Sequence, residues 1–470
     1  MDSLDAKTLS DAVKQKLFGL QQLVTDFETV LIHPTCEQFI KGIRLLLEAV
    51  EESHQQWLDE LPSGPEGEEH VKTVSKICLS ILANIHSEFL PYLDSSAQQT
   101  SYLLLPTLTK AVDTFRGDAT VELALVPQFE YTYGIAGLPQ FAKLEINKLD
   151  YTDEKKKTAR LAAAAALPSW TAFVSYPMVE KNSALNLAVV SHELAHLVDF
   201  IKELYKPLVP QKLDEEAFKK LIEEASTALE AAGFQVGPQL KDRIEAEYYK
   251  DCVQMVVSWL KEVIADIIAL RVLGPAYLFS FLEFLAHGAF ENQHDSEHPA
   301  PARRLKLLID ELSSMNYFKV DTGVTKQLQA IKTRVSDEAK TTVYQQHALV
   351  ADKTLETTLD SLLTNLRKFC SSISYTAERY RDEVPPVVRL IQQGIAPIET
   401  CSAEPKAVRT PSPVVAVLNA GWEVYKVGAD EFSKLFEEDV SKSQQVVTLN
   451  HLLFKAIEAG ELLREWQKTV

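Results

Sequence analysis

Residues 185–201 have the sequence LNLAVVSHELAHLVDFI, the most informative segment in the middle of the chain. It is apolar apart from Asn186, Ser191, Asp199 and the motif residues His192, Glu193 and His196, a pattern typical of a helix that is buried on nearly all sides. Residues four apart lie one above the other on a helix, so His192 and His196 can point at one metal ion with Glu193 beside them. Burying such titratable side chains is costly unless their charge is compensated, and a divalent cation compensates them well. The stretch therefore predicts a metal-binding helix; the alternative is an amphipathic surface helix that carries His and Glu by chance.

A second stretch, residues 259–269, has the sequence WLKEVIADIIA and offers two carboxylates. Glu262 and Asp266 lie one helical turn apart, which puts both on one face of a helix among aliphatic neighbours. A metal site that leaves one position for water needs a third protein ligand, and Glu262 can supply it. Asp266 can then accept the second ring N–H of a ligand histidine. The alternative is a surface helix whose acids face water.

Three motifs follow one another along the chain. The pattern H-E-x-x-H at residues 192–196 is followed by E-x-x-A-D at residues 262–266 and by H-P-x-x-x-x-R at residues 298–304. This order resembles the catalytic core of the gluzincin metallopeptidases. It is most similar to the branch that contains the CAAX prenyl endopeptidases and the bacterial heat-shock membrane endopeptidases. The resemblance covers roughly residues 165–310, and the rest of the chain is unmatched.

The resemblance implies a zinc ion and a hydrolytic reaction. It implies that zinc binds to His192, His196 and Glu262, that Glu193 is the general base, and that Asp266 supports the site. In such sites zinc lowers the pKa of its bound water to about 7 and polarises the scissile carbonyl. The base then passes the proton to the leaving amine. The predicted function is therefore that of a zinc metalloendopeptidase acting on a protein or peptide substrate.

The developing oxyanion of this reaction needs a donor besides the metal. The resemblance places His298 and Arg304 near the substrate, where they would stabilise the reacting centre. A His-Pro pair is also often only a loop turn. Tyr277 is a further candidate donor, and a buried core phenol is the alternative for it.

This chain departs from the membrane-embedded members of that branch. Its longest apolar runs are Ala162–Leu167, Leu185–Val190 and Ile264–Ala269, each far shorter than the roughly 18 residues that a membrane-spanning helix needs. We therefore expect no membrane span and do not carry over the membrane-linked substrates. The net charge of −18 and the pI near 5.2 also argue against binding to nucleic acids or anionic membranes, which favour a basic face.

The N-terminus and the cysteines indicate a cytoplasmic protein. The N-terminal sequence MDSLDAKTLSDAVKQKLFGL is polar and lacks the apolar core of a signal peptide. The five cysteines are odd in number, scattered and never in C-x-x-C pairs, which argues against a disulfide scaffold. Cys252 falls on the same predicted helix as Glu262 and is interpreted as a small core residue.

Hydrophobic periodicity predicts a mostly helical (α+β) protein. Residues 1–60 and 68–115 show helical spacing, whereas short runs at residues 120–126, 129–133 and 170–176 predict a small sheet. In the gluzincin plan such a sheet flanks the zinc, and its edge pairs with an extended substrate. The alternative is that these strands only pack in the core.

Five regions are predicted along the chain. They are an N-terminal helical region, a zincin-like catalytic core that carries the sheet, a second helical region, a Pro-containing linker or loop, and a C-terminal helical region, at residues 1–115, 116–315, 316–395, 396–413 and 414–470. The pair Pro385-Pro386 and the Pro- and Ser-containing stretch from Pro397 to Pro413 predict a linker or long loop.

Two other functions stay open. The core could be a dormant zincin, a zinc-stabilised helical scaffold that binds a protein partner through the polar C-terminal helices. Glu193 argues against this, because it contributes little to structure if no water is activated. A helical binding protein without metal would require the clustering of buried titratable groups to be a coincidence.

Overall fold

The computed structural model describes residues 5–30, 36–59, 65–89, 121–128, 133–168, 170–177, 180, 183–287, 293–320, 322–341, 346–400 and 410–469. Contacts between Cα atoms divide the chain into two compact units, Met1–Lys181 and Asn182–Val470. Helices dominate these ranges and strands are short, so the predicted mostly α protein with a small sheet is confirmed. Within the same ranges, no helix combines the length and the apolar composition that crossing a membrane requires.

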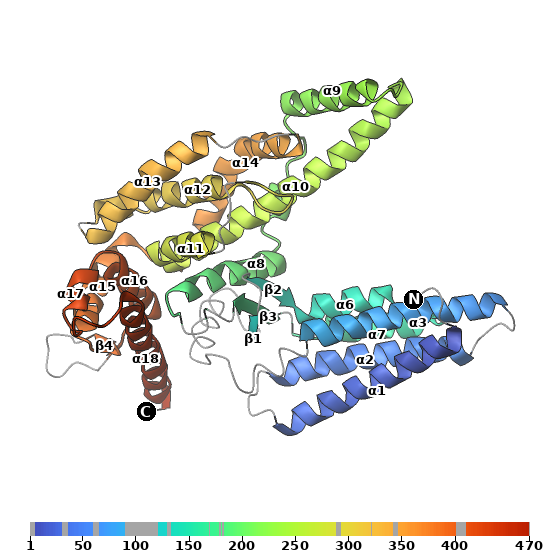
Figure 1. Cartoon of the computed structure of the whole chain (residues 1–470), viewed down its shortest axis with the longest axis horizontal. Helices are drawn as coiled ribbons and strands as arrows, with labels where there is room; N and C mark the ends of the chain where they lie inside the picture. Colours follow the sequence, from blue (N-terminus) through green and yellow to red (C-terminus); the bar gives the residue numbers. More distant parts are fainter. Residues whose placement is uncertain are drawn as a thin grey trace. The chain divides into compact units, whose positions relative to one another are not determined.

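The N-terminal unit is built on packed helices (Figure 1). They are α1 (Ala6–Val30), α2 (Cys36–Asp59), α3 (Pro65–Asn84) with the π-helical turn η1 (Ile85–Phe89), α6 (Leu138–Lys148) and α7 (Glu154–Ala165). Their apolar faces form one core that includes Val13, Ile43 and Cys78. Gly42 lets α2 approach α6 closely, because a Cβ atom there would lie 2.6 Å from a methyl carbon of Leu138. The predicted helix over residues 68–115 is confirmed up to residue 89, and the rest of it lies outside the described residues.

A three-stranded sheet completes this unit. It consists of β1 (Val121–Gln128), β2 (Gly134–Gly137) and β3 (Trp170–Pro177) in the order β1-β3-β2. The central strand β3 pairs in parallel with β1 and antiparallel with β2. The strands predicted at residues 120–126 and 170–176 are thus confirmed, whereas the run predicted at residues 129–133 falls mostly outside the described residues. The sheet belongs to the N-terminal unit and the motif helix to the C-terminal one, so the expected place of the sheet beside a metal stays a prediction.

The C-terminal unit is organised around one long helix, α10 (Pro238–Leu273). Helices that pack against it are α8 (Val190–Lys202), α9 (Glu215–Ala231), α11 (Pro275–His287), α12 (Pro301–Ser314), α14 (His347–Phe369) and α16 (Val414–Lys426). The half of α10 from Val256 onward is almost continuously buried, which explains its run of aliphatic residues. Gly274 ends the helix with a positive φ of 64°, a conformation that costs other residues strain.

Shorter elements and a further helical layer complete the unit. They are η3 (Asn186–Val189), η4 (Lys206–Leu208), η5 (Tyr317–Lys319), α13 (Gly323–Thr341), α15 (Ala377–Gln392), β4 (Glu399–Thr400), β5 (Thr410–Pro411), α17 (Ala429–Ser433) and α18 (Lys442–Thr469). Strands β4 and β5 pair antiparallel at the two described ends of the predicted linker.

The interpretation of Pro385-Pro386 as a loop signal is wrong. Both prolines lie inside helix α15, although each lacks the N–H that an interior helical position normally donates. Val384 and Val387, which flank them, are completely buried, and α15 packs closely against α16. Tertiary burial of this apolar face therefore outweighs the unfavourable local propensity.

Candidate metal centre

The start of the motif helix is held in place by three distant helices. The Leu185 carbonyl accepts hydrogen bonds from the Ser280 hydroxyl (2.6 Å) and from the indole N–H of Trp422 (3.3 Å). The backbone N–H of Leu185 donates to the side-chain oxygen of Asn450 at 3.3 Å. These side chains come from α11, α16 and α18, so the chain enters η3 and α8 along a defined path.

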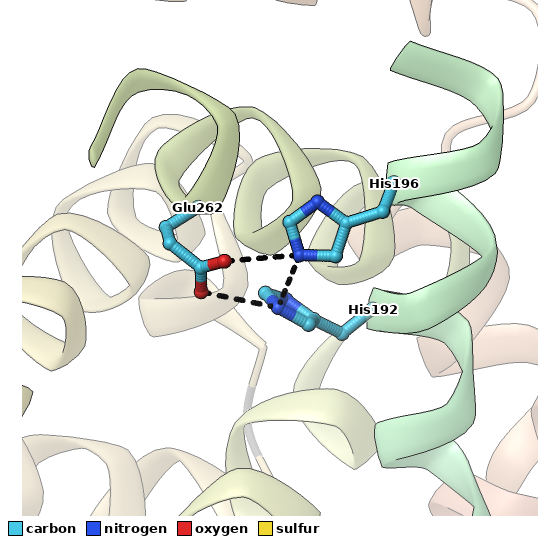
Figure 2. A group of neighbouring side chains, drawn as sticks. All are labelled: His192, His196 and Glu262. Carbon is cyan, nitrogen blue, oxygen red and sulfur yellow. Dashed lines mark hydrogen bonds and ion pairs between the residues drawn. The ribbon is translucent and has the colours of Figure 1, made fainter. Parts of the chain in front are cut away.

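Helix α8 presents its histidines to a carboxylate on α10 (Figure 2). The Nε2 atoms of His192 and His196 lie 3.0 Å apart. Glu262 Oε2 lies 3.3 Å from Nε2 of His192, and Glu262 Oε1 lies 3.1 Å from Nε2 of His196. Two side chains one turn apart on α8 and one from α10 thus point their electron-donating atoms at each other.

The spacing of these atoms fits the ligands of one ion. Tetrahedral ligands about 2.0–2.1 Å from a zinc ion lie roughly 3.3 Å from one another, and octahedral ligands lie roughly 3.0 Å apart. Glu262 Oε2 is buried without a hydrogen-bond partner, although Arg304 Nη1 lies 3.2 Å away as an ion pair. His192, His196 and Glu262 can therefore hold a metal ion. Two imidazoles and a carboxylate suit several divalent ions, so geometry alone does not identify the metal.

Asp266 lies behind His192, on the side of the ring that faces away from His196 and Glu262. Its Oδ1 atom is 3.0 Å from His192 Nδ1 and accepts a hydrogen bond of 2.6 Å from the Tyr277 hydroxyl. Tyr277 is fully buried, and its hydroxyl lies 3.2 Å from the same Nδ1 atom. A carboxylate that accepts the Nδ1 proton leaves the Nε2 lone pair free to bind a metal.

Arg304 joins the two carboxylates of α10. Its guanidinium donates two hydrogen bonds to Asp266, from Nε at 2.8 Å and from Nη2 at 2.9 Å, and its Nη1 lies 3.2 Å from Glu262. The guanidinium also lies over the ring of Phe281, 4.7 Å from its centre. The structure thus brings Arg304 against the acids rather than leaving it exposed.

The charged groups of this cluster shift one another's pKa values. Burial acts to raise the pKa of Glu262 and of Asp266, but the Arg304 charge and the neighbouring imidazoles hold both values well below their ordinary range. Burial acts to lower the pKa of His192, yet the two carboxylates raise it to about 10. The carboxylates thus strongly attract positive charge to this point, and a metal ion would have to displace the His192 proton.

His298 lies at the exposed edge of the cluster. Its side chain is 45% exposed, and its Nε2 atom lies 4.0 Å from Glu262 Oε2. The other ring nitrogen faces Asp295, a residue that the motifs do not include. The signal that could have identified Asp295 is its position three residues before His298, because Asp side chains often close such turns.

Glu193 differs from the other acids of the site. The residue is 9% exposed, and in the described part of the chain its carboxylate forms no hydrogen bond or ion pair. A nearly buried carboxylate that has no protein partner can still accept a hydrogen bond from a water molecule or a substrate.

No protein-family model, no curated protein and no solved structure matches this chain. The resemblance to gluzincins therefore depends on the three sequence motifs.

Proposed function

We propose that this chain is a zinc-dependent metalloendopeptidase. The observation that carries the proposal is the convergence of metal-binding atoms from His192, His196 and Glu262 on one place between two helices. Two histidines and a glutamate, with one position left for water, are a ligand set of catalytic zinc. When bound, zinc would supply Lewis-acid chemistry that acidifies water and polarises a carbonyl.

The balance of charge supports a divalent ion at this place. With neutral imidazoles, the carboxylates of Glu193, Glu262 and Asp266 contribute three negative charges and Arg304 contributes one positive charge. A divalent cation brings the sum to zero, which a mostly buried cluster requires because uncompensated charge there is costly.

Glu193 is the general base in this proposal. Its carboxylate has no partner in the described part of the chain, and it follows a proposed ligand directly on α8. It takes a proton from the attacking water and delivers it to the nitrogen of the leaving amine. A carboxylate tied up by an arginine would be a weaker base, and Arg304 contacts Asp266 and Glu262 instead.

Three further residues have separate roles in the proposal. His298 is the donor to the developing oxyanion, because it is the partly exposed group beside Glu262. Arg304 neutralises Asp266 and Glu262, which its guanidinium contacts. Tyr277 helps to hold Asp266 against His192, because its hydroxyl donates to Asp266 and lies beside Nδ1 of His192. The sequence also offered Tyr277 as an oxyanion donor. Its hydroxyl faces Nδ1 of His192 rather than Nε2, the atom that would bind the metal, so this position does not favour that role.

Elemental analysis and peptide digestion together test the proposal. We expect about one zinc ion per chain and cleavage of a peptide library that a chelator abolishes. Glu193→Gln should lower cleavage by about 10²–10⁴-fold and keep the metal, whereas Glu216→Gln, an exposed acid on α9, should change neither. Absence of bound metal would overturn the proposal. Bound zinc without any cleavage would favour the dormant zincin, a zinc-stabilised scaffold.

A further inference from the structure

A closed turn precedes helix α12 and carries His298. Asp295 Oδ1 accepts hydrogen bonds from the backbone N–H groups of Glu297 (2.7 Å) and His298 (2.6 Å). The backbone N–H of Asp295 in turn donates to the His298 carbonyl at 3.1 Å. Residues 295–298 form a turn that the Asp295 side chain closes, and we name it the Asp295–His298 turn.

The same carboxylate also holds the imidazole ring. His298 Nδ1 lies 3.0 Å from Asp295 Oδ2 and 3.1 Å from Oδ1. Since a carboxylate is only an acceptor, Nδ1 carries the proton and donates it. The ring is therefore oriented with Nε2 toward Glu262 Oε2, 4.0 Å away. An imidazole that is 45% exposed would otherwise be free to change rotamer.

Trp259 connects this turn to the helix that carries Glu262. Its indole N–H donates to the Asp295 carbonyl at 3.2 Å, and the residue is completely buried. Trp259 lies three positions before Glu262 on α10, so both side chains leave the same side of the helix. Helix α10, which supplies Glu262, therefore also fixes the position of the turn.

We propose that Asp295 is a positioning residue that fixes the His298 imidazole at the exposed edge of the His192–His196–Glu262 group. The inference rests on the proposed function, in which His298 stabilises the reacting centre. Asp295 acts through His298 and does not itself touch the substrate. With Nδ1–H donated to Asp295, His298 acts as a donor when its ring also carries a proton on Nε2, and the Asp295 contact keeps that second N–H in its orientation. Holding a donor in its productive orientation lowers the barrier, because less freedom is lost when the transition state forms.

The tautomer of His298 in the metal-free protein tests the positioning directly. Nitrogen-15 labelling of histidine, with the His298 signal assigned from His298→Ala, should show the Nδ1–H form in the native chain at a pH where the ring is neutral. Asp295→Ala should produce a mixture of both tautomers. Glu297→Gln, an exposed acid in the same turn, should leave the native form. A native Nε2–H form, or an unchanged tautomer in Asp295→Ala, would overturn the proposal.

Closure of the turn and orientation of the ring can be separated by a second variant. Asp295→Asn keeps one side-chain oxygen for the backbone N–H groups, but it loses the charge and the second oxygen that face Nδ1. We expect Asp295→Asn to preserve the melting temperature of the native chain and to show intermediate tautomer populations. A purely structural role would instead make the loss of stability the only effect of Asp295→Ala.

Kinetics connect the turn to the proposed reaction. On a peptide that the native protein cleaves, Asp295→Ala should lower kcat about tenfold with KM and metal content unchanged. The same substitution should have no further effect in the His298→Ala background, and additive losses would overturn the proposal. If the native tautomer is as expected but no peptide is cleaved, the proposed function fails and the orientation of His298 by Asp295 stands.

Discussion

Two clusters of buried charge lie along helices α10 and α12, and they differ in whether both oxygens of the central glutamate accept hydrogen bonds. In the first, Glu311 of α12 is enclosed by Arg271 of α10 and Arg367 of α14. Nε of Arg271 donates to Oε1 at 2.8 Å, and Nη2 of Arg367 donates to Oε2 at 2.7 Å. In the second, at the metal centre, Glu262 keeps a buried oxygen without a hydrogen bond.

This contrast shows that burial of charge does not by itself indicate a functional site. The Glu311 cluster satisfies both carboxylate oxygens with hydrogen-bond donors, which is sufficient to explain it as structure. At the metal centre, two imidazole nitrogens and a carboxylate converge with more lone pairs than donors. An excess of lone pairs requires a proton or a cation, and this is what separates the two regions.

The largest expected effect comes from removing the acid of each cluster and measuring the metal. Glu262→Ala should lose bound zinc and all cleavage, because two histidines alone leave the ion without its third protein ligand. Glu311→Gln is the matched control in the Glu311 cluster and should retain about one zinc ion per chain. Elemental analysis of both purified variants makes the comparison. Zinc retained in Glu262→Ala would place the third ligand elsewhere.

Removal of the proposed base should have the next largest effect. Glu193→Gln should lower kcat by about 10²–10⁴-fold, since an amide cannot take a proton from water. The metal content should stay at the native level, because Glu193 is not one of the three proposed ligands. A variant with native zinc and the native rate would show that the base is another group.

Removing the charge of the Glu311 cluster should have a smaller effect, on the stability of the protein. Glu311→Gln should lower the free energy of unfolding by about 3 kcal/mol, because two guanidinium groups then lose their buried counter-charge. Glu356→Gln removes one exposed partner of Arg303 and should cost less than about 1 kcal/mol. Denaturant unfolding at pH 7 compares the two variants. Equal stabilities would mean that the Glu311 cluster contributes no more than a surface ion pair.

The smallest effect is a difference in acid sensitivity. Burial acts to raise the pKa of Glu311, but hydrogen bonds and charge from Arg367 and Arg271 leave it below its ordinary value of 4.5. A lowered folded-state pKa stabilises the protein above pH 4.5, and this stabilisation is lost as the pH falls through the folded-state pKa. Native protein should therefore lose stability more steeply below that pH than Glu311→Gln. Parallel stability curves for the two proteins would contradict the assignment.

Local patterns predicted much of the secondary structure. The apolar spacing around His192 predicted a buried helix, and the short β-like runs at residues 120–126 and 170–176 predicted strands. Pro385-Pro386 was misinterpreted, because local propensity does not include the burial of Val384 and Val387. A pattern succeeds where local preference and tertiary packing agree, and it fails where packing overrides the preference.

The candidate site was predictable only in part. Asp295 was missed, since its contact with the ring of His298 depends on a side-chain orientation that no periodicity encodes. Tyr277 was open between a donor and a core phenol, and the structure places its hydroxyl on Asp266. Both residues lie outside the three motifs and contact a motif residue, so neither carries a motif of its own.

The order of residues along the chain is enough to put His192 and His196 on one side of a helix and Glu262 and Asp266 on one side of another, because helical periodicity is a local property. That these two sides face each other follows only from tertiary packing, which brings Nε2 of His192 within 3.3 Å of Oε2 of Glu262. It also decided that Arg304 neutralises both acids while Glu193 keeps its carboxylate free of partners in the described chain. Distances between separate helices depend on how all the surrounding side chains pack, and no short segment contains that information.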